Sequence, residues 1–177
     1  MTLISAPFKR VSDLIRQEML NPTPSDAVLD ALRDIGRRTI RRAADSKATL
    51  DDTFNQLEAF AFGVYFNGRV YRQGYLDEQR YRNTHKNAAG KEAKGAEKDR
   101  KRGKYGRSQA LHEINEKYHP EHRGYVLYFT NAMWYSLIHE KWGLPIISQE
   151  IKNAVSEVES LFNVSVDVQF YEYPYSN

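Results

Sequence analysis

Residues 124–143, GYVLYFTNAMWYSLIHEKWG, are unusually rich in apolar and aromatic side chains, and they constrain the fold more than any other stretch. The segment begins with aromatic, β-branched and apolar side chains, which suit a buried, pleated strand. After Asn131 and Ala132 the apolar residues recur at helical spacing, until Gly143 and Pro145 end the helix. We therefore expect a central strand that runs into a short aromatic helix. The core residues expected here are Val126, Leu127, Met133, Trp134, Tyr135, Ile138 and Trp142.

The composition limits the class of protein. A chain of 177 residues is long enough for one domain with a proper core, and its 41% hydrophobic and 28% charged residues are ordinary for a globular protein. The absence of cysteine excludes disulfides, thiolate metal sites and cysteine nucleophiles. No apolar run approaches the roughly 18 residues of a membrane span, and the N-terminus lacks the pattern of a secretion signal. We expect a single domain, residues 1–177, made in a cytoplasm and without membrane contact.

Two helices are expected in the first 45 residues. Residues 8–20 have the pattern of a short amphipathic helix, and residues 25–45 that of a longer one, which Ser25 or Thr23 can cap. The apolar stripe of the longer helix consists of Val28, Leu32, Ile35, Thr39, Ile40 and Ala43. The rest of its surface carries a basic patch, made of Arg37, Arg38, Arg41 and Arg42. This patch is either a solvated helix face, as surface charge usually is, or an edge that binds an anion or a partner.

Residues 59–76 have the pattern of a β-hairpin. Phenylalanines at alternate positions, among them the core candidates Phe60 and Phe62, lead to Asn67-Gly68, the strongest two-residue hairpin signal. A second strand follows this turn. We expect the phenylalanine face of the first strand to pack against the longer helix.

The last third of the chain completes an α+β pattern. Residues 108–118 are expected to form a short helix, and residues 148–162 a longer one with a clear apolar face. Residues 164–170 alternate strictly between apolar and polar, so a strand with one buried face is expected there, followed by an extended tail at 171–177. The expected fold is a small antiparallel sheet packed against a long N-terminal helix and a C-terminal helix, with residues 124–170 as a strand–helix–helix–strand core.

Residues 82–107 are a long basic insertion into this fold. They contain ten Lys and Arg against three acidic residues, a net charge of +7, whereas the rest of the chain has a net charge of −4. Apart from Tyr105 the insertion has no large apolar side chain, so we expect a mobile loop in the free protein. Its charge favours nucleic acid or an acidic protein surface as the partner, although loops also tolerate insertions without a function. Candidate interface residues are Lys98, Arg100, Lys101, Arg102, Lys104, Tyr105 and Arg107, and, in the tail, Tyr171, Tyr173 and Tyr175.

No motif for catalysis or cofactor binding is complete. The glycine pair in the insertion lacks the Lys and the Ser or Thr of a phosphate-binding loop. His119 and His122, with Glu121 between them, would need a further metal ligand such as His139 or Glu140. No single element offers the i, i+4 histidine pair that zinc hydrolases use. We therefore expect no enzyme activity, no cofactor and no metal site.

Two segments follow recurring patterns. Residues 50–76 fit the frame T-G-N-L-x-x-S-x-G-Y-x-x-Y-x-N-G at Thr53, Asn55, Phe62, Tyr65, Asn67 and Gly68. Residues 124–165 fit G-[YF]-V-L-x-x-x-x-x-M-x-Y-A-x-x-x-E-x-x-G at Gly124, Tyr125, Val126, Leu127, Met133, Tyr135, Glu140 and Gly143. Both patterns resemble those of the small head–tail joining proteins of tailed bacteriophages, the tail-completion or neck family. The order of the expected elements also agrees with that family.

The resemblance implies a non-enzymatic structural subunit that forms a ring at the head–tail junction of the virion, assembled in the host cytoplasm. The partners would be further copies of the chain and the neighbouring portal, adaptor and tail proteins. On this hypothesis the insertion becomes ordered on assembly and reaches an acidic neighbour, while the tail adds to a neighbour's sheet edge.

A nucleic-acid-binding module is the alternative. The insertion and the Arg37–Arg42 patch could track phosphates, and Tyr105 could stack on a base. A neck protein also lines a DNA channel, so non-specific contact with packaged DNA is compatible with both readings. A small metal-dependent hydrolase is a third possibility, and it requires His119, His122 and a carboxylate to converge.

Overall fold

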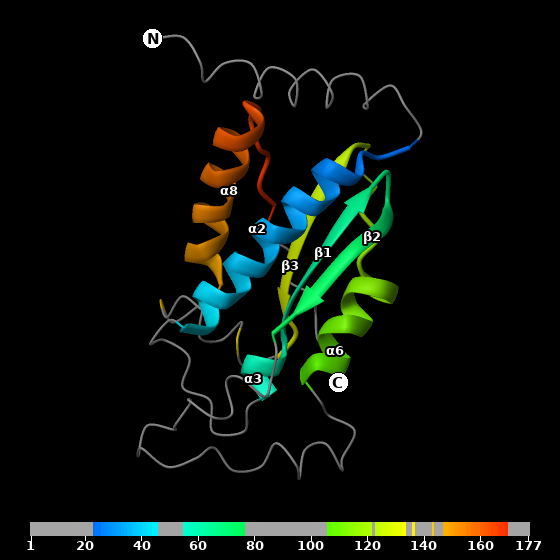
Figure 1. Ribbon diagram of the computed structural model, residues 1–177. Helices are drawn as coiled ribbons and strands as arrows, with labels where there is room; N and C mark the ends of the chain where they lie inside the picture. Colours follow the sequence, from blue (N-terminus) through cyan, green and yellow to red (C-terminus); the bar gives the residue numbers. More distant parts are fainter. Residues whose placement is uncertain are drawn as a thin grey trace.

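The computed structural model describes residues 23–45, 55–76, 106–121, 123–133, 136, 143 and 147–169. These residues form the α+β fold that the sequence predicts, with a three-stranded antiparallel sheet and helices on both of its faces (Figure 1). The elements are α2 (Asp26–Asp45), α3 (Asn55–Glu58), β1 (Phe60–Phe66), β2 (Arg69–Tyr75), α6 (Gly106–His112), the π-helix η1 (Glu113–Lys117), β3 (Tyr125–Asn131) and α8 (Ser148–Phe162).

The central strand of the sheet is β1, because the strand order is β2-β1-β3. All seven residues of β1 are buried, whereas those of β3 are half-buried apart from Thr130. The expectation of a strand at the start of residues 124–143 is confirmed, but its central position is wrong. Apolar content is a local property, whereas the place of a strand in a sheet depends on which distant segments pair with it.

The hairpin turn at Asn67-Gly68 is confirmed, and it is also attached to the start of β3. Asn67 and Gly68 have φ angles of 49° and 80°, as a two-residue turn of this type requires. The backbone N–H of Asn67 donates to the carbonyl of Gly124 (3.0 Å), and the N–H of Gly124 donates to Oδ1 of Asn67 (2.8 Å). The turn of the hairpin therefore also helps to fix the register between β1 and β3.

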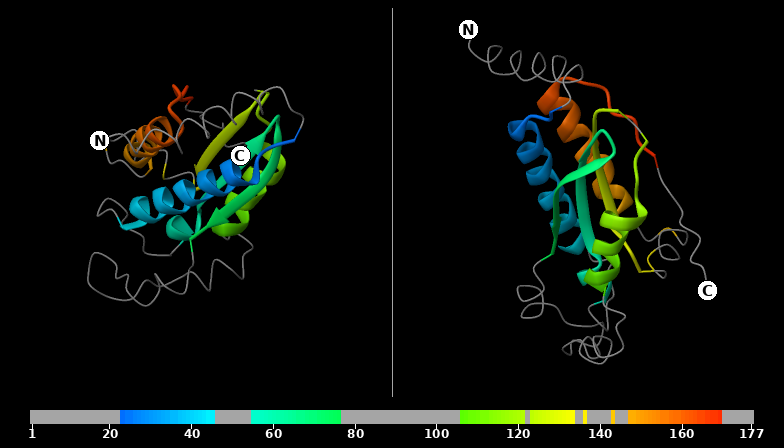
Figure 2. Two further views of the ribbon diagram at one scale, coloured as in Figure 1. Left: turned by 45° about the horizontal axis from the view of Figure 1, so that its top comes forward. Right: turned by 90° about the vertical axis from the view of Figure 1, so that its right-hand side faces the viewer.

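Helix α2 covers one face of the sheet, and α6 with η1 covers the other (Figures 1 and 2). The backbone N–H of Val28 donates to Oγ of Ser25 at 3.5 Å, which makes Ser25 the residue that caps α2. Every residue of the predicted apolar stripe of α2 is buried. The stripe packs against the face of β1 that carries Phe60, Phe62 and Val64, as expected.

The ring of Phe62 fills the space between two glycines on different elements. A Cβ atom on Gly36 of α2 would lie 2.4 Å from Cδ2 of Phe62, and one on Gly74 of β2 would lie 2.5 Å from its Cε1. Gly74 is the cross-strand partner of Phe62. Both glycines are thus required for the close approach of helix, ring and strand.

A second core cluster lies on the opposite face of β1. It joins Ala61 and Tyr65 to Ala110, Ile114 and Tyr118. The hydroxyl of Tyr65 donates to the carbonyl of Ile114 at 2.5 Å, and its ring meets that of Tyr118 edge-on, 5.2 Å between centroids. The helix expected at 108–118 is therefore confirmed, although it begins at Gly106 and its last turn is a π-helix.

Helix α8 has the predicted bounds and ends at Asn163, whose left-handed conformation is usual after a helix. The strand predicted at 164–170 is wrong over its described part, since residues 164–169 belong to no strand. Val164 and Val168 are 37% and 40% exposed. The alternation is a local signal for a strand, but a strand also needs a partner for its backbone groups, and these residues have no such ladder within the described chain.

Several expectations fall outside the described residues. They concern the helix at 8–20, the insertion up to residue 105, the tail at 171–177, and the core candidates Trp134, Tyr135, Ile138 and Trp142. The other core candidates are described: Phe60 and Phe62 are fully buried, and Val126, Leu127 and Met133 are half-buried. Among the helices that the structure describes, none has both the length and the apolar character needed to cross a membrane.

Candidate functional site

Part of the basic patch on α2 forms ion pairs with α8. Arg42 contacts Glu150 through Nε and Glu157 through Nη1, both at 2.7 Å, and Nη2 of Arg38 lies 2.8 Å from the other oxygen of Glu157. Arg37 and Arg41 are exposed, and no ion pair joins them to another described residue. The predicted patch is therefore divided: Arg38 and Arg42 form ion pairs with α8, and Arg37 and Arg41 form none with the described residues.

These contacts shift the pKa values of Glu157 and Arg42. Burial alone would raise the pKa of Glu157, but hydrogen bonds from Arg38 and Arg42 outweigh burial and hold the pKa below its ordinary value. Burial likewise opposes the charge on Arg42, but hydrogen bonds to Glu150 and Glu157 outweigh it and raise the pKa. Both groups are therefore charged at neutral pH, so the ion pairs are formed there.

The ion pairs of Glu157 predict a loss of stability in acid. A carboxylate whose pKa is lower in the folded than in the unfolded state stabilises the fold fully above its unfolded pKa, about 4.3. This contribution is lost as the pH falls through the lower, folded-state value. We expect Glu157→Gln to reduce the free energy of unfolding by about 1 kcal/mol at pH 7, and by progressively less as the pH falls below the unfolded-state pKa. Urea denaturation of both proteins across this range measures the difference, and a difference independent of pH would contradict the assignment.

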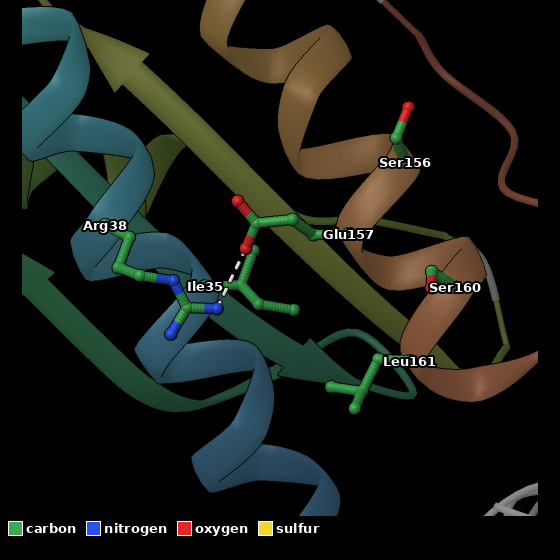
Figure 3. A pocket seen from close by; sticks show the side chains of 6 residues that line it. All are labelled: Ile35, Arg38, Ser156, Glu157, Ser160 and Leu161. Atoms are coloured by element: carbon green, nitrogen blue, oxygen red, sulfur yellow. Dashed lines mark hydrogen bonds and ion pairs between the residues drawn. The ribbon is translucent and has the colours of Figure 1, made fainter.

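A groove of about 460 Å³ lies between α2 and α8 (Figure 3). Ile35 and Leu161 give it an apolar wall, and the Arg38–Glu157 pair crosses it. Its remaining lining residues are Ser156 and Ser160. No histidine lies beside the two serines in this lining, and the carboxylate is held by two arginines, so the groove lacks a base for nucleophilic catalysis.

The basic insertion leaves and re-enters the described fold at neighbouring points. Nη2 of Arg107 donates to the carbonyl of Leu76 at 3.3 Å, and its guanidinium lies 4.1 Å from the centre of the Tyr75 ring. Arg107 was expected to lie in the mobile loop, and this is wrong, because it belongs to α6 and contacts the end of β2. Its place in an interface stays a prediction. The other interface candidates lie outside the described residues: Lys98, Arg100, Lys101, Arg102, Lys104, Tyr105, Tyr171, Tyr173 and Tyr175.

A buried polar network at the end of the sheet was not predicted. Nε2 of Gln56 donates to Oγ of Ser136 (3.0 Å), and Nδ2 of Asn131 donates to the carbonyl of Gln56 (2.9 Å). Beside it, the hydroxyl of Thr130 donates to the carboxylate of Glu113, which is 7% exposed. These bonds tie α3, η1 and β3 together. One feature of the sequence does indicate the burial of Glu113. This residue shares a helical face with apolar Ala110 and Ile114, and such a face is normally turned away from solvent.

The histidines proposed as metal ligands do not converge among the described residues. His119 is exposed, and its Nε2 lies 2.9 Å from the carbonyl of Glu116, while Glu121 is also exposed. His122, His139 and Glu140 lie outside the described residues. Within the described part of the chain, no three histidine or acidic side chains are grouped so that they could hold a metal ion.

The two outer edges of the sheet differ in character. The β2 edge carries Arg69 and Arg72 and contains an irregularity in its pairing with β1 near Tyr71. Arg72 forms ion pairs with Asp26 and Asp30 of α2, and hydrogen bonds to these two aspartates raise its pKa. The β3 edge, YVLYFTN, has no charged residue and no proline. Charge, proline and bulges are the usual protection of a sheet edge, so among the described residues β3 is the edge that lacks these features.

Comparisons of the chain with protein-family models, with curated proteins and with solved structures find no match.

Proposed function

We propose that this chain is a non-enzymatic structural subunit that assembles into a ring at the head–tail junction of a tailed-bacteriophage virion. The observation that supports the proposal most is the contact between the two segments that resemble the neck family. Their turn and strand start, Asn67 and Gly124, are joined by reciprocal hydrogen bonds, and β1 pairs with β3 along its whole length. The long helix, hairpin, strand and helix also follow one another in the order that the resemblance implies, although the final strand of that order is absent from residues 164–169.

The surface of the subunit supports assembly rather than catalysis. The described residues contain an unprotected sheet edge, and exposed apolar side chains at the end of α8 and in the segment after it, namely Leu161, Val164 and Val168. Exposed apolar residues that lie close together are typical of protein interfaces. In a closed ring each subunit presents two different surfaces, one to each neighbour, which fits an edge and a separate apolar segment on the same chain.

The first experiment measures the mass of the purified full-length protein by light scattering, alone and with portal, adaptor and tail proteins of the same virion. A ring of defined mass, formed alone or on one of these partners, would support the proposal. A protein that stays monomeric alone and in the presence of each of these partners would contradict the proposal.

The basic insertion is expected to be needed for assembly but not for folding. Leu76 precedes the insertion and contacts Arg107 at its end, so removing residues 86–104 leaves Gly106 and α6 in place and should keep the monomer's thermal transition. We expect the deletion variant to lose the ring, because it loses most of the positive charge that would reach a neighbour. An unchanged ring would contradict this role of the insertion.

Charge-neutral variants test the insertion more finely. Lys98→Gln, Arg100→Gln and Lys101→Gln together should weaken assembly. The matched control, Arg33→Gln, Arg37→Gln and Arg41→Gln, removes the same charge from α2 and should leave assembly unchanged.

Nucleic-acid binding remains the second candidate, because the insertion has a net charge of +7. The structure reduces the predicted binding surface, since Arg38 and Arg42 are paired with glutamates. Binding to phosphates must weaken steeply as salt is added, with a slope set by the number of contacts. A monomer that does not bind the neck proteins, but binds duplex DNA with an affinity that falls steeply with salt concentration, would favour this candidate.

A further inference from the structure

We propose that the outer edge of β3 pairs with residues 164–169 of a second copy of this chain, so that the sheet continues from one subunit into the next. This inference deepens the proposed function and rests on it, because it names the contact that would join neighbours in the ring.

The edge of β3 offers backbone groups for such a pairing. Asn67 and Gly124 are joined directly by a backbone hydrogen bond, and in an antiparallel ladder the bonded pairs alternate along the strand. From Gly124 onward every second residue of β3 is therefore bonded to β1. The backbone groups of Leu127 and Phe129 point to the outer edge, where the described chain supplies no further strand.

The side chains of this edge also favour a partner. Leu127 and Phe129 are half-buried on the α2 face of the sheet, and Val126 is half-buried on the opposite face. A seven-residue edge strand with such side chains and no charge is a template for strand addition. The contrast with β2, which has two arginines and an irregular ladder, shows that only one of the two edges is protected.

Residues 164–169, VSVDVQ, have the character of the strand that would pair there. Val164, Val166 and Val168 fall on one face and Ser165 and Asp167 on the other, which is the period of a strand with one apolar side. Val164 and Val168 are nevertheless exposed. The N–H of Val166 donates to the side chain of Glu159 (3.2 Å), a contact that a neighbouring strand could replace. Six residues extend for roughly 20 Å, enough to follow most of β3.

A second copy is the occupant because the described residues of each chain contain an acceptor edge and a strand-like segment, and no ladder joins the two. The segment follows Asn163 directly, so α8 holds it at its first residue. Pairing of edge with segment is a contact between two different surfaces, and such a contact forms a ring when the rotation from one subunit to the next closes. Backbone bonds would give affinity, and the valine side chains would give the register.

The first test compares Val168→Pro with Val168→Thr in the full-length protein. Proline has no N–H to donate to a ladder and is tolerated in an exposed segment outside helices and strands, whereas threonine is a good strand residue. We expect Val168→Pro to reduce ring formation at least tenfold by light scattering, with the thermal transition of the monomer unchanged. Val168→Thr should assemble like the wild type. Equal assembly of the two variants would overturn the inference.

The second test uses the absence of cysteine in the chain. Leu127→Cys is mixed with Val164→Cys, Val166→Cys or Val168→Cys on separate chains, and oxidation should give a disulfide-linked dimer in at least one mixture. Gln73→Cys on the β2 edge replaces Leu127→Cys as the control and should give none.

The outcomes separate this inference from the ring itself. A ring that forms without any β3-to-segment link, or a link found only when both cysteines lie on one chain, overturns strand exchange and leaves the proposed function standing. A protein that forms neither ring nor link, alone or with neck partners, overturns both.

Discussion

Replacing Phe62 with alanine is expected to lower the free energy of unfolding by about 3–5 kcal/mol. The ring is fully buried and fills the space that Gly36 of α2 and Gly74 of β2 leave open, so neither element can close the cavity without moving. Urea denaturation followed by circular dichroism measures the loss. A cost near 1 kcal/mol would mean that helix and strand collapse onto each other after the ring is removed.

Gly36→Ala is the matched substitution. Its effect on the free energy of unfolding should have opposite signs in the wild type and in the Phe62→Ala variant. Alanine is the better helix former by about 1 kcal/mol, but its Cβ atom would lie 2.4 Å from the Phe62 ring, so we expect a net loss of about 1–2 kcal/mol in the wild type. In Phe62→Ala the obstacle is absent, and the same substitution should stabilise the protein. An equal effect of Gly36→Ala in both backgrounds would contradict the packing described here.

Replacing Tyr65 with alanine is the second large effect, again about 3–5 kcal/mol. Its ring is buried between β1 and η1, against Tyr118 and Tyr128, whose own rings are stacked 3.9 Å apart. Tyr65→Phe keeps the ring and removes only the hydrogen bond to the carbonyl of Ile114, so its cost should be about 1 kcal/mol.

The exposed Tyr75 provides the control for these substitutions. It is 47% exposed, and Tyr75→Phe should change stability by no more than about 0.5 kcal/mol. If Tyr65→Phe costs as much as Tyr65→Ala, the hydroxyl rather than the ring holds η1 to the sheet.

Signals confined to neighbouring residues predicted most of the elements. The period of Val28, Leu32 and Ile35 identified α2, the Asn67-Gly68 pair fixed the hairpin, and α8 has its predicted bounds. Each of these signals depends on the geometry of one helix or one turn. They could be found in the sequence because no distant segment is needed to interpret them.

The errors concern properties that depend on distant segments. The apolar side chains of residues 124–143 predicted a strand but not its position at the edge of the sheet. The alternation of apolar and polar residues after Asn163 predicted a strand where the described chain offers no partner strand. Arg107 looked like part of a solvated basic run until its contacts with Leu76 and Tyr75 were visible.

The polar residues show the same limit. Arg38 and Arg42 are separated from their glutamates by more than a hundred residues, and the partners of Gln56 lie about 80 residues away. No period in the sequence connects such pairs. The candidate surface for assembly became visible only when the outer edge of β3, which pairs with no further strand of the described chain, and the exposed valines were found on one molecule.

The distance along the chain between β1 and β3 sets the order in which this sheet can form. The hairpin of β1 and β2 closes across two residues, whereas the pair of Phe66 with Tyr125 closes a loop of about 60 residues that includes the whole basic insertion. Closing a longer loop costs more entropy, and contacts distant in sequence form later and more slowly. During folding, α2 and the hairpin can therefore dock before β3 arrives. A newly made chain would expose its central strand until residues 125–131 have been synthesised and have paired with it.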